Sequence, residues 1–330
     1  MAGNHMEFEK PIVELQKKVD ELKKLSADGA IDAAEEISKM EKKIRIMKKN
    51  MYKNLEPWQI VQIMRNVERP KTLDYIDSCF TDFNEMHGDR QFKDDKALVG
   101  GIARLDGVSV VVLGQQKGKD TKENIYRNFG MAQPEGYRKA LRLMKFAEKF
   151  SMPVICFIDT TGAFPGLEGE ERGAAEAIAR NLHEMAGLRV PIIVAVIGEG
   201  GSGGALGIGV GDRILMMKYA TYSVISFEGC ASILWKDPSK ASGAAKALRP
   251  TAKDLLEFKV IDEIISEPAE GAHMNFKKAA KNVKESLERN LKTLMEIPVE
   301  KLLEERYEKF RTMGVYKSEK NDSGKSGPLE

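Results

Sequence analysis

The stretch Gly198-Glu-Gly-Gly-Ser-Gly-Gly-Ala-Leu-Gly-Ile-Gly-Val-Gly-Asp212 decides how the rest of this chain is organised. It follows the apolar run Val190-Pro-Ile-Ile-Val-Ala-Val-Ile197, whose Val and Ile content is typical of a strand buried on both faces of a sheet. Glycine lacks the Cβ atom that keeps a ligand away from the main chain, and it permits a positive φ at a sharp turn. The sequence therefore predicts a buried strand that opens into a loop without side chains at Gly200, Gly201, Gly203 and Gly204.

Ser202 is predicted to cap a short helix through Ala205 and Leu206, whose first N–H groups would attract negative charge. Three interpretations of the loop stay open. In the first, the glycines only let the helix pack closely on the sheet. In the second, the loop binds a phosphate or dinucleotide, although its spacing misses G-x-G-x-x-G and no G-K-[ST] ending follows. In the third, paired backbone N–H groups form an oxyanion hole for an enolate or tetrahedral oxygen.

Composition narrows the class of protein. The chain has 330 residues, of which 42% are hydrophobic, enough for one large α/β domain or two smaller ones. A formal net charge of +2 gives no electrostatic case for binding nucleic acid. The longest apolar runs are far shorter than the roughly 20 residues of a membrane span. Because Glu7, Glu9 and Lys10 also interrupt any signal-peptide core, we expect a soluble, cytoplasmic protein.

Cysteine and histidine give no sign of a metal site. The three cysteines are widely spaced and odd in number, which excludes a disulfide framework and a C-x-x-C site. None of the four histidines lies in an H-E-x-x-H arrangement, so we expect no zinc in this chain. These residues are Cys79, Cys156, Cys230, His5, His87, His183 and His273.

The N-terminal part is predicted to be helical. Apolar residues recur at intervals of three and four over 12–25 and 37–47, with Asp28-Gly29 between them as a turn signal, which predicts an antiparallel helical hairpin. Further helices are predicted at 54–69 and at 74–86, the second with Phe83 facing inward. The polar loop that follows, His87-Gly-Asp-Arg90, is either an ordinary turn or the edge of a site.

The middle of the chain alternates strands and helices. Residues 98–105 and 108–113 read as two strands joined by Asp106-Gly107, a strong hairpin signal. A buried strand at 153–158 then opens into a second glycine-bearing loop, Asp159-Thr-Thr-Gly-Ala-Phe-Pro-Gly166. Repetition of strand, loop and helix predicts parallel strands, so that both glycine loops leave the same edge of the sheet, where ligand sites of α/β proteins usually lie. The other predicted strands are 213–218, 222–225 and 260–265, and the other helices 137–150, 174–184, 227–235, 251–258, 276–295 and 299–313.

Several motifs, spread from about residue 7 to residue 314, match one known family. They are Leu73-Asp-Tyr75, Asp94-Asp-Lys-Ala97, Val99-Gly-Gly-Ile-Ala-Arg-Leu-Asp106, Arg127-Asn-Phe-Gly-Met131, Pro134-Glu-Gly-Tyr-Arg-Lys-Ala-Leu-Arg-Leu-Met144, the glycine stretch from Gly198 to Asp212, Thr221-Tyr-Ser-Val-Ile-Ser226 and Glu228-Gly-Cys-Ala-Ser-Ile-Leu-Trp-Lys236. With them the chain resembles the alpha-subunit family of bacterial acetyl-coenzyme A carboxylase carboxyltransferase, a crotonase-like group. It departs from the family pattern at Thr161 and Phe164 in the second loop and at Phe227, where proline is expected; neither departure touches Gly203 and Gly204.

The resemblance implies an α/β fold, the crotonase/ClpP-like β-β-α superhelix, with an N-terminal helical hairpin and C-terminal helices. It divides the chain into an N-terminal helical region at 7–90, the carboxyltransferase core at 91–270 and C-terminal helices at 271–317. Residues 1–6 are interpreted as a cloning remnant before a start at Met6. Residues 318–330, rich in Ser, Gly, Lys and Asp, are predicted to be disordered.

The activity implied is the transfer of a carboxyl group from carboxybiotin to acetyl-coenzyme A, giving malonyl-coenzyme A for fatty-acid synthesis. Carboxybiotin leaves a ureido oxyanion behind, and the acetyl group passes through a thioester enolate. Backbone N–H pairs stabilise such oxygens without a titratable group. By resemblance, Gly203 and Gly204 form the hole for the biotin oxygen, and the substrate is bound by Gly200, Gly201, Ser202, Ala205, Gly162, Ala163 and Phe164.

The partners implied are a beta subunit in an alpha2-beta2 heterotetramer, the biotin carboxyl carrier protein that brings carboxybiotin, and biotin carboxylase in the larger complex. The beta subunit would hold the enolate and a zinc ion. Lys117, Lys119 and Arg172 are candidates for shaping the site's electrostatics, with a solvated surface role as the alternative. Two rival functions stay open: an enoyl-coenzyme A hydratase or isomerase, which needs Glu general bases such as Glu228, and a non-enzymatic assembly protein.

Overall fold

The computed structural model describes residues 6–27 and 33–314. In this part of the chain, eight strands form one sheet in the order β1-β2-β3-β4-β5-β6-β8, with β7 paired to the carboxyl end of β5. The first three strands are antiparallel neighbours, and the strands from β3 onward run parallel. Their bounds are β1 (Thr81–Glu85), β2 (Leu98–Leu105), β3 (Val108–Gln115), β4 (Val154–Thr160), β5 (Ile192–Gly201), β6 (Arg213–Met217), β7 (Thr221–Ser223) and β8 (Glu263–Ile265).

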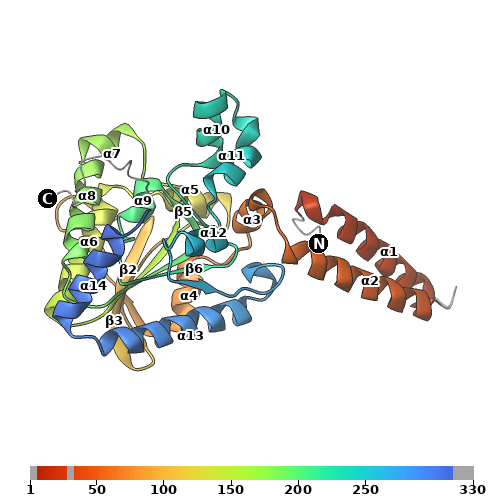
Figure 1. The fold of residues 1–330 in the computed structure, drawn as a ribbon, viewed down its shortest axis with the longest axis horizontal. Helices are drawn as coiled ribbons and strands as arrows, with labels where there is room; N and C mark the ends of the chain where they lie inside the picture. Colours follow the sequence, from red (N-terminus) through yellow and green to blue (C-terminus); the bar gives the residue numbers. More distant parts are fainter. Residues whose placement is uncertain (1–5, 28–32, 315–330) are drawn as a thin grey trace, which may run out of the picture.

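Helices cover both faces of the sheet (Figure 1). A Cβ at Gly100 of β2 would meet Leu143 of α6, whereas one at Gly114 of β3 would meet Thr72 of α4, so these helices lie on opposite faces. α8 packs on α6, and α13 packs on α4. The α-helices are α1 (Lys10–Ala27), α2 (Ala34–Lys53), α3 (Pro57–Met64), α4 (Thr72–Cys79), α5 (Thr121–Tyr126), α6 (Pro134–Lys149), α7 (Leu167–Glu171), α8 (Ala174–Ala186), α9 (Ser202–Leu206), α10 (Phe227–Trp235), α11 (Ala241–Leu248), α12 (Ala252–Glu257), α13 (Phe276–Met295) and α14 (Val299–Arg311).

The strands that were predicted from apolar runs are confirmed as the buried strands β4 and β5. Every residue of β4 and β5 is buried, as expected for parallel strands covered on both faces. The hairpin between β2 and β3 is also confirmed: Asp106 and Gly107 have φ values of 48° and 81°, the pair of positive values that a type I′ turn requires.

The predicted helical hairpin is confirmed as α1 and α2, which pack through Ile12, Val19 and Ile44 and extend away from the sheet (Figure 1). The turn expected at Asp28-Gly29 and the interpretations of residues 1–5 and 315–330 fall outside the described residues. A second pair, α10 and α11, also stands clear of the sheet, at the end where the parallel strands finish (Figure 1). Within the described ranges, no helix is both long and apolar enough to cross a membrane.

Two helix predictions in the N-terminal region are wrong in their extent. The helix expected at 74–86 ends at Cys79, and Thr81–Glu85 forms β1, the edge strand paired to β2. Asp82 has a φ of 55°, and the register between β1 and β2 shifts there. The pairing of this segment with β2 therefore outweighs the local helical pattern in which Phe83 was expected to face inward. The helix expected at 54–69 is confirmed only as α3, which ends at Met64.

A candidate active site where two glycine loops meet

The two glycine loops leave adjacent parallel strands and touch through their main chains. β4 and β5 pair in parallel from Val154 and Ile192, the register shifts after Ile158, and the last pair is Thr160 with Gly200. A Cβ at Gly201 would lie 2.1 Å from the carbonyl oxygen of Thr161, and one at Gly204 would lie 2.2 Å from the carbonyl carbon of Gly162. Glycine is therefore required at 201 and 204 because these residues pack on the main chain of the second loop, whereas the first interpretation expected close packing of the helix on the sheet.

Gly203 and Gly162 are glycines that packing does not explain. The nearest atom to a Cβ at Gly203 would be Cδ1 of Ile178 at 3.9 Å, and a Cβ at Gly162 would have no neighbour within 4 Å. Neither residue has a positive φ that would exclude other side chains. The missing side chains instead leave open space beside the half-buried main chain at both glycines, which is what close approach of a ligand requires.

Ser202 does not act as the predicted cap. The N-cap of α9 is Gly201, with no side-chain hydrogen bond, and Ser202 is the first residue of the helix. Its φ of 50° lies in the left-handed region, which costs a non-glycine residue about 1–2 kcal/mol. The exposed Ser202 thus marks a strained turn from strand to helix, a kind of strain that clusters at functional sites.

The other predicted substrate residues differ in accessibility. Ala163 and Phe164 are half-buried in the second loop, where the N–H of Phe164 donates to the carbonyl of Ala132 at 3.1 Å. Gly200 packs on the ring of Tyr222, at 2.7 Å from the position of a Cβ. Gly204 and Ala205 are buried, so Ala205 offers no side-chain contact to a ligand.

Buried charges lie directly beneath the loops. The Lys117 ammonium is 3.0 Å from the Asp159 carboxylate and 3.1 Å from that of Glu199. Burial by itself would lower the pKa of Lys117, but these two carboxylates outweigh it and raise the pKa. Burial likewise opposes ionisation of Asp159, yet Lys117 and Lys71 hold its pKa below the usual value. The solvated surface role considered for Lys117 is therefore wrong, and its role in the site's electrostatics stays a prediction.

The acidic residues near the loops are ion-paired. Glu228 accepts two hydrogen bonds from Arg65, at 2.6 and 3.0 Å, and these lower its pKa. Glu199 lies 3.7 Å from the same guanidinium in addition to its contact with Lys117. Phe227, the departure from the family's proline, is buried against Arg65 and Trp58. These contacts favour the structural interpretation of Glu228 over that of a hydratase's general base.

The two remaining candidate cations lie outside this cluster. Lys119 is 63% exposed and pairs with Asp74 at 2.6 Å, which agrees with the surface interpretation. Arg172 binds the side chains of Gln133 and Glu135 at the start of α6, at 2.5 and 3.2 Å, and so anchors the segment after α7.

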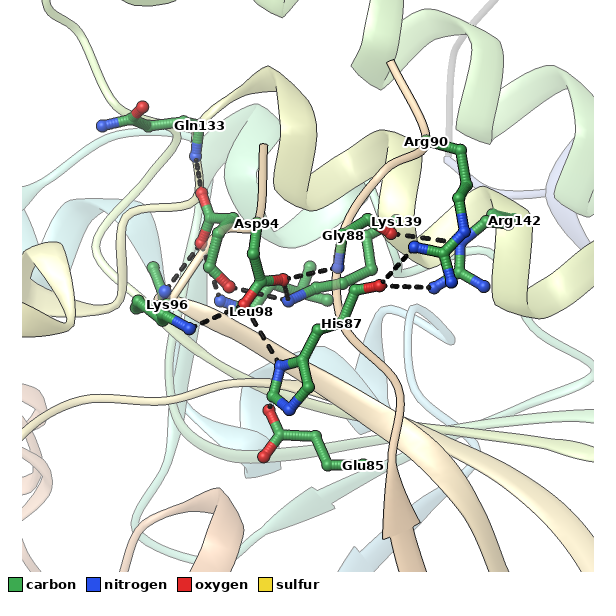
Figure 2. A network of polar contacts seen from close by, with 12 residues as sticks. Glu85, His87, Gly88, Arg90, Asp94, Lys96, Leu98, Gln133, Lys139 and Arg142 are labelled. Atoms are coloured by element: carbon green, nitrogen blue, oxygen red, sulfur yellow. Dashed lines mark hydrogen bonds and ion pairs between the residues drawn. The ribbon is translucent and has the colours of Figure 1, made fainter. Parts of the chain in front are cut away.

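The loop from His87 to Arg90 is held by a network that ends on α6 (Figure 2). Asp94 accepts from the buried Lys139 at 2.7 Å and from the N–H of Gly88 at 2.8 Å. Burial would raise the pKa of Asp94, but hydrogen bonds from Lys139 and Gly88 outweigh it and hold the pKa well below its usual range. Arg142 of α6 donates to the carbonyl of Gly88. These bonds anchor the segment to α6.

The cysteines are core residues rather than nucleophiles. All three are buried and unpaired, and burial raises the pKa of the Cys79 thiol to about 12. Within residues 6–27 and 33–314, no group of three or more His, Cys, Asp or Glu side chains could hold a metal ion.

Comparison with known proteins decides the family. The model of the family described as acetyl co-enzyme A carboxylase carboxyltransferase-like matches residues 5–314. The chain belongs to this family. The acetyl-coenzyme A carboxylase carboxyl transferase subunit alpha of Geobacter metallireducens is 58% identical over 317 residues, 96% of this chain and 99% of that protein. The chain is thus a carboxyl-transferring enzyme of the alpha-subunit type, and neither rival function fits it.

Solved structures support the fold at low sequence identity. The transcarboxylase 12S structure matches 63% of this chain and 40% of its own, with 20% identity and a TM-score of 0.51. A Pseudomonas malonate decarboxylase hetero-tetramer in complex with coenzyme A matches 71% of this chain and 91% of its own, with 16% identity and a TM-score of 0.56. The predicted crotonase-like fold is confirmed.

Proposed function

We propose that this chain, together with a beta subunit, transfers carboxyl from carboxybiotin to acetyl-coenzyme A, and that its glycine loop stabilises the biotin oxyanion. The main support for this proposal is Gly203. Neither packing nor its φ requires glycine at this position, and the missing side chain leaves open space. When carboxybiotin releases its carboxyl group, negative charge gathers on the ureido oxygen. N–H groups of Gly203 and Gly204 would stabilise that charge, and one such donor contributes roughly 10²–10³ in rate.

The charges beneath the loop support this mechanism. Lys117, Asp159 and Glu199 form a buried cluster in which the N–H of Glu199 donates to Asp159 at 3.0 Å. Because these carboxylates are paired, none is left as a free base beside the loop. The methyl proton of acetyl-coenzyme A then passes to the biotin nitrogen, and the thioester enolate is stabilised by the beta subunit.

A partner subunit is supported by apolar side chains around the loops. α5, α9 and α10 all follow the carboxyl ends of parallel strands, and each exposes large hydrophobic residues. They are Ile125, Tyr126, Leu206, Ile233 and Leu234, between 41% and 66% exposed. We propose that the beta subunit covers this surface in an alpha2-beta2 assembly, and that the biotin carboxyl carrier protein delivers carboxybiotin to it in the cytoplasm.

The test is carboxylation of free biotin at the expense of malonyl-coenzyme A, the reverse reaction. The wild-type chain should be inactive alone and active with a cognate beta subunit. Gly203→Ala should lower the rate by about 10²-fold without impairing assembly, because its methyl group clashes with nothing in this chain but occupies the ligand's space. Gly187→Ala, at the C-cap of α8 with a φ of −99°, is the matched control and should retain full activity. An assembled wild-type complex without activity would refute the proposed function.

A further inference from the structure

Gln115 connects the two glycine loops from below. It is the last residue of β3 and is fully buried. Its Nε2 donates to the carbonyl oxygen of Gly204 at 3.1 Å, and its Oε1 accepts from the N–H of Asp159 at 3.2 Å. One side-chain amide thus joins α9, which follows β5, to the end of β4.

The carbonyl of Gly204 depends on side chains for its hydrogen bonds. In the short helix α9, the carbonyl of Gly203 accepts from the N–H of Gly207 at 3.0 Å. The Gly204 carbonyl accepts instead from Gln115 and, at 3.3 Å, from the Tyr137 hydroxyl. Because a peptide group is planar, fixing this carbonyl also fixes the N–H of Ala205 in the same plane, and the N–H of Gly204 lies in the peptide group directly before it.

Asp159, whose N–H donates to Oε1 of Gln115, is itself held by further contacts. Asp159 accepts from the N–H of Glu199 at 3.0 Å and pairs with Lys117 at 3.0 Å. Gln115, Gly204, the loop back to Glu199, and Asp159 therefore form a closed ring of contacts across three neighbouring strands. The amide of Gln115 supplies, at any pH, both the donor and the acceptor that this position uses at once.

We propose that Gln115 is a positioning residue that holds α9 in register with β4, so that the N–H groups of Gly203 and Gly204 keep a fixed direction. This inference rests on the proposed function. An oxyanion hole acts through groups that are already oriented before charge develops, so loosening α9 weakens binding of the transition state more than binding of substrate. A variant that loses the hydrogen bonds of Gln115 should therefore have a lower kcat at an unchanged KM.

The experiment uses the complex with the beta subunit and the biotin carboxylation assay. Gln115→Met removes both hydrogen bonds at similar length, and kcat should fall by about 10²-fold while KM for biotin changes less than about threefold. Tyr137→Phe, which leaves the Gln115 bond in place, should lower kcat less. Cys156→Ala, in the buried part of β4 without a bond to either loop, is the control for lost stability and should keep kcat.

Gln115→Glu provides a readout that lost stability does not predict. The new carboxyl group donates to the Gly204 carbonyl only when protonated, so the kcat of this variant relative to wild type should rise as the pH falls. If Gln115→Met does not assemble, Gln115→Glu and Tyr137→Phe carry the test. A kcat near that of wild type in Gln115→Met, or a pH-independent ratio in Gln115→Glu, would overturn the inference. An inactive wild-type complex would instead refute the proposed function.

Discussion

Replacing Gly204 by alanine should destabilise the fold, although the family resemblance places this residue in the oxyanion hole. A Cβ here would lie 2.2 Å from the carbonyl carbon of Gly162 and 2.4 Å from the nitrogen of Ala163. Non-bonded carbon atoms prefer about 3.5–4.0 Å, so the loops would have to separate by more than about 1 Å. Both obstacles are main-chain atoms that no rotamer change removes. Overpacking of this kind costs about 1–3 kcal/mol, and we expect the upper end.

Thermal and urea unfolding of the isolated chain measure this cost, with Gly203→Ala as the matched variant. Its nearest neighbour would be 3.9 Å away, so its free energy of unfolding should stay within about 1 kcal/mol of wild type. Equal stability of the two variants would refute the steric reasoning. A larger residue at 204, such as valine, consequently impairs folding and activity together, so only Gly203 separates the chemistry from the packing.

Three other predictions follow from contacts away from the glycines. Arg306 donates two hydrogen bonds of 2.8 Å to the buried Asp212. Arg306→Met removes this partner and should lower the free energy of unfolding, measured in urea, by about 3–5 kcal/mol. A decrease below about 1 kcal/mol would contradict this reasoning. Ser202→Gly should keep carboxyl transfer within a few-fold of wild type, since only main-chain N–H groups are invoked, and a loss of 10²-fold would show that the hydroxyl takes part. The hydrogen bond from Lys139 lowers the pKa of Asp94 in the folded protein. Its contribution to stability is therefore present above the unfolded pKa of about 3.9 and is lost as the pH falls towards the folded pKa. Asp94→Asn should be less stable than wild type at pH 7, and its free energy of unfolding should fall less than that of wild type between pH 5 and pH 2.

Much of the fold could be predicted because burial and turn chemistry are local. Apolar runs predicted the existence of β4 and β5, although both strands continue into residues expected in the loops, to Thr160 and Gly201, and Asp106-Gly107 predicted the hairpin. The helix α10 was predicted with its observed bounds. β1 was missed because an edge strand with an irregularity has no clear alternation, and its pairing with β2 is a tertiary contact.

For the site, the sequence by itself determined that two glycine loops follow parallel strands and that the motifs belong to one family. Only the tertiary structure decided what each glycine does. Gly201 and Gly204 are needed for packing, whereas Gly203 and Gly162 face open space. It also brought Gln115 between the loops and turned Ser202 from a cap into a strained turn. These distinctions depend on distances between residues that are remote in the chain. The spacing of glycines in the sequence does not show which atoms a Cβ at each position would contact.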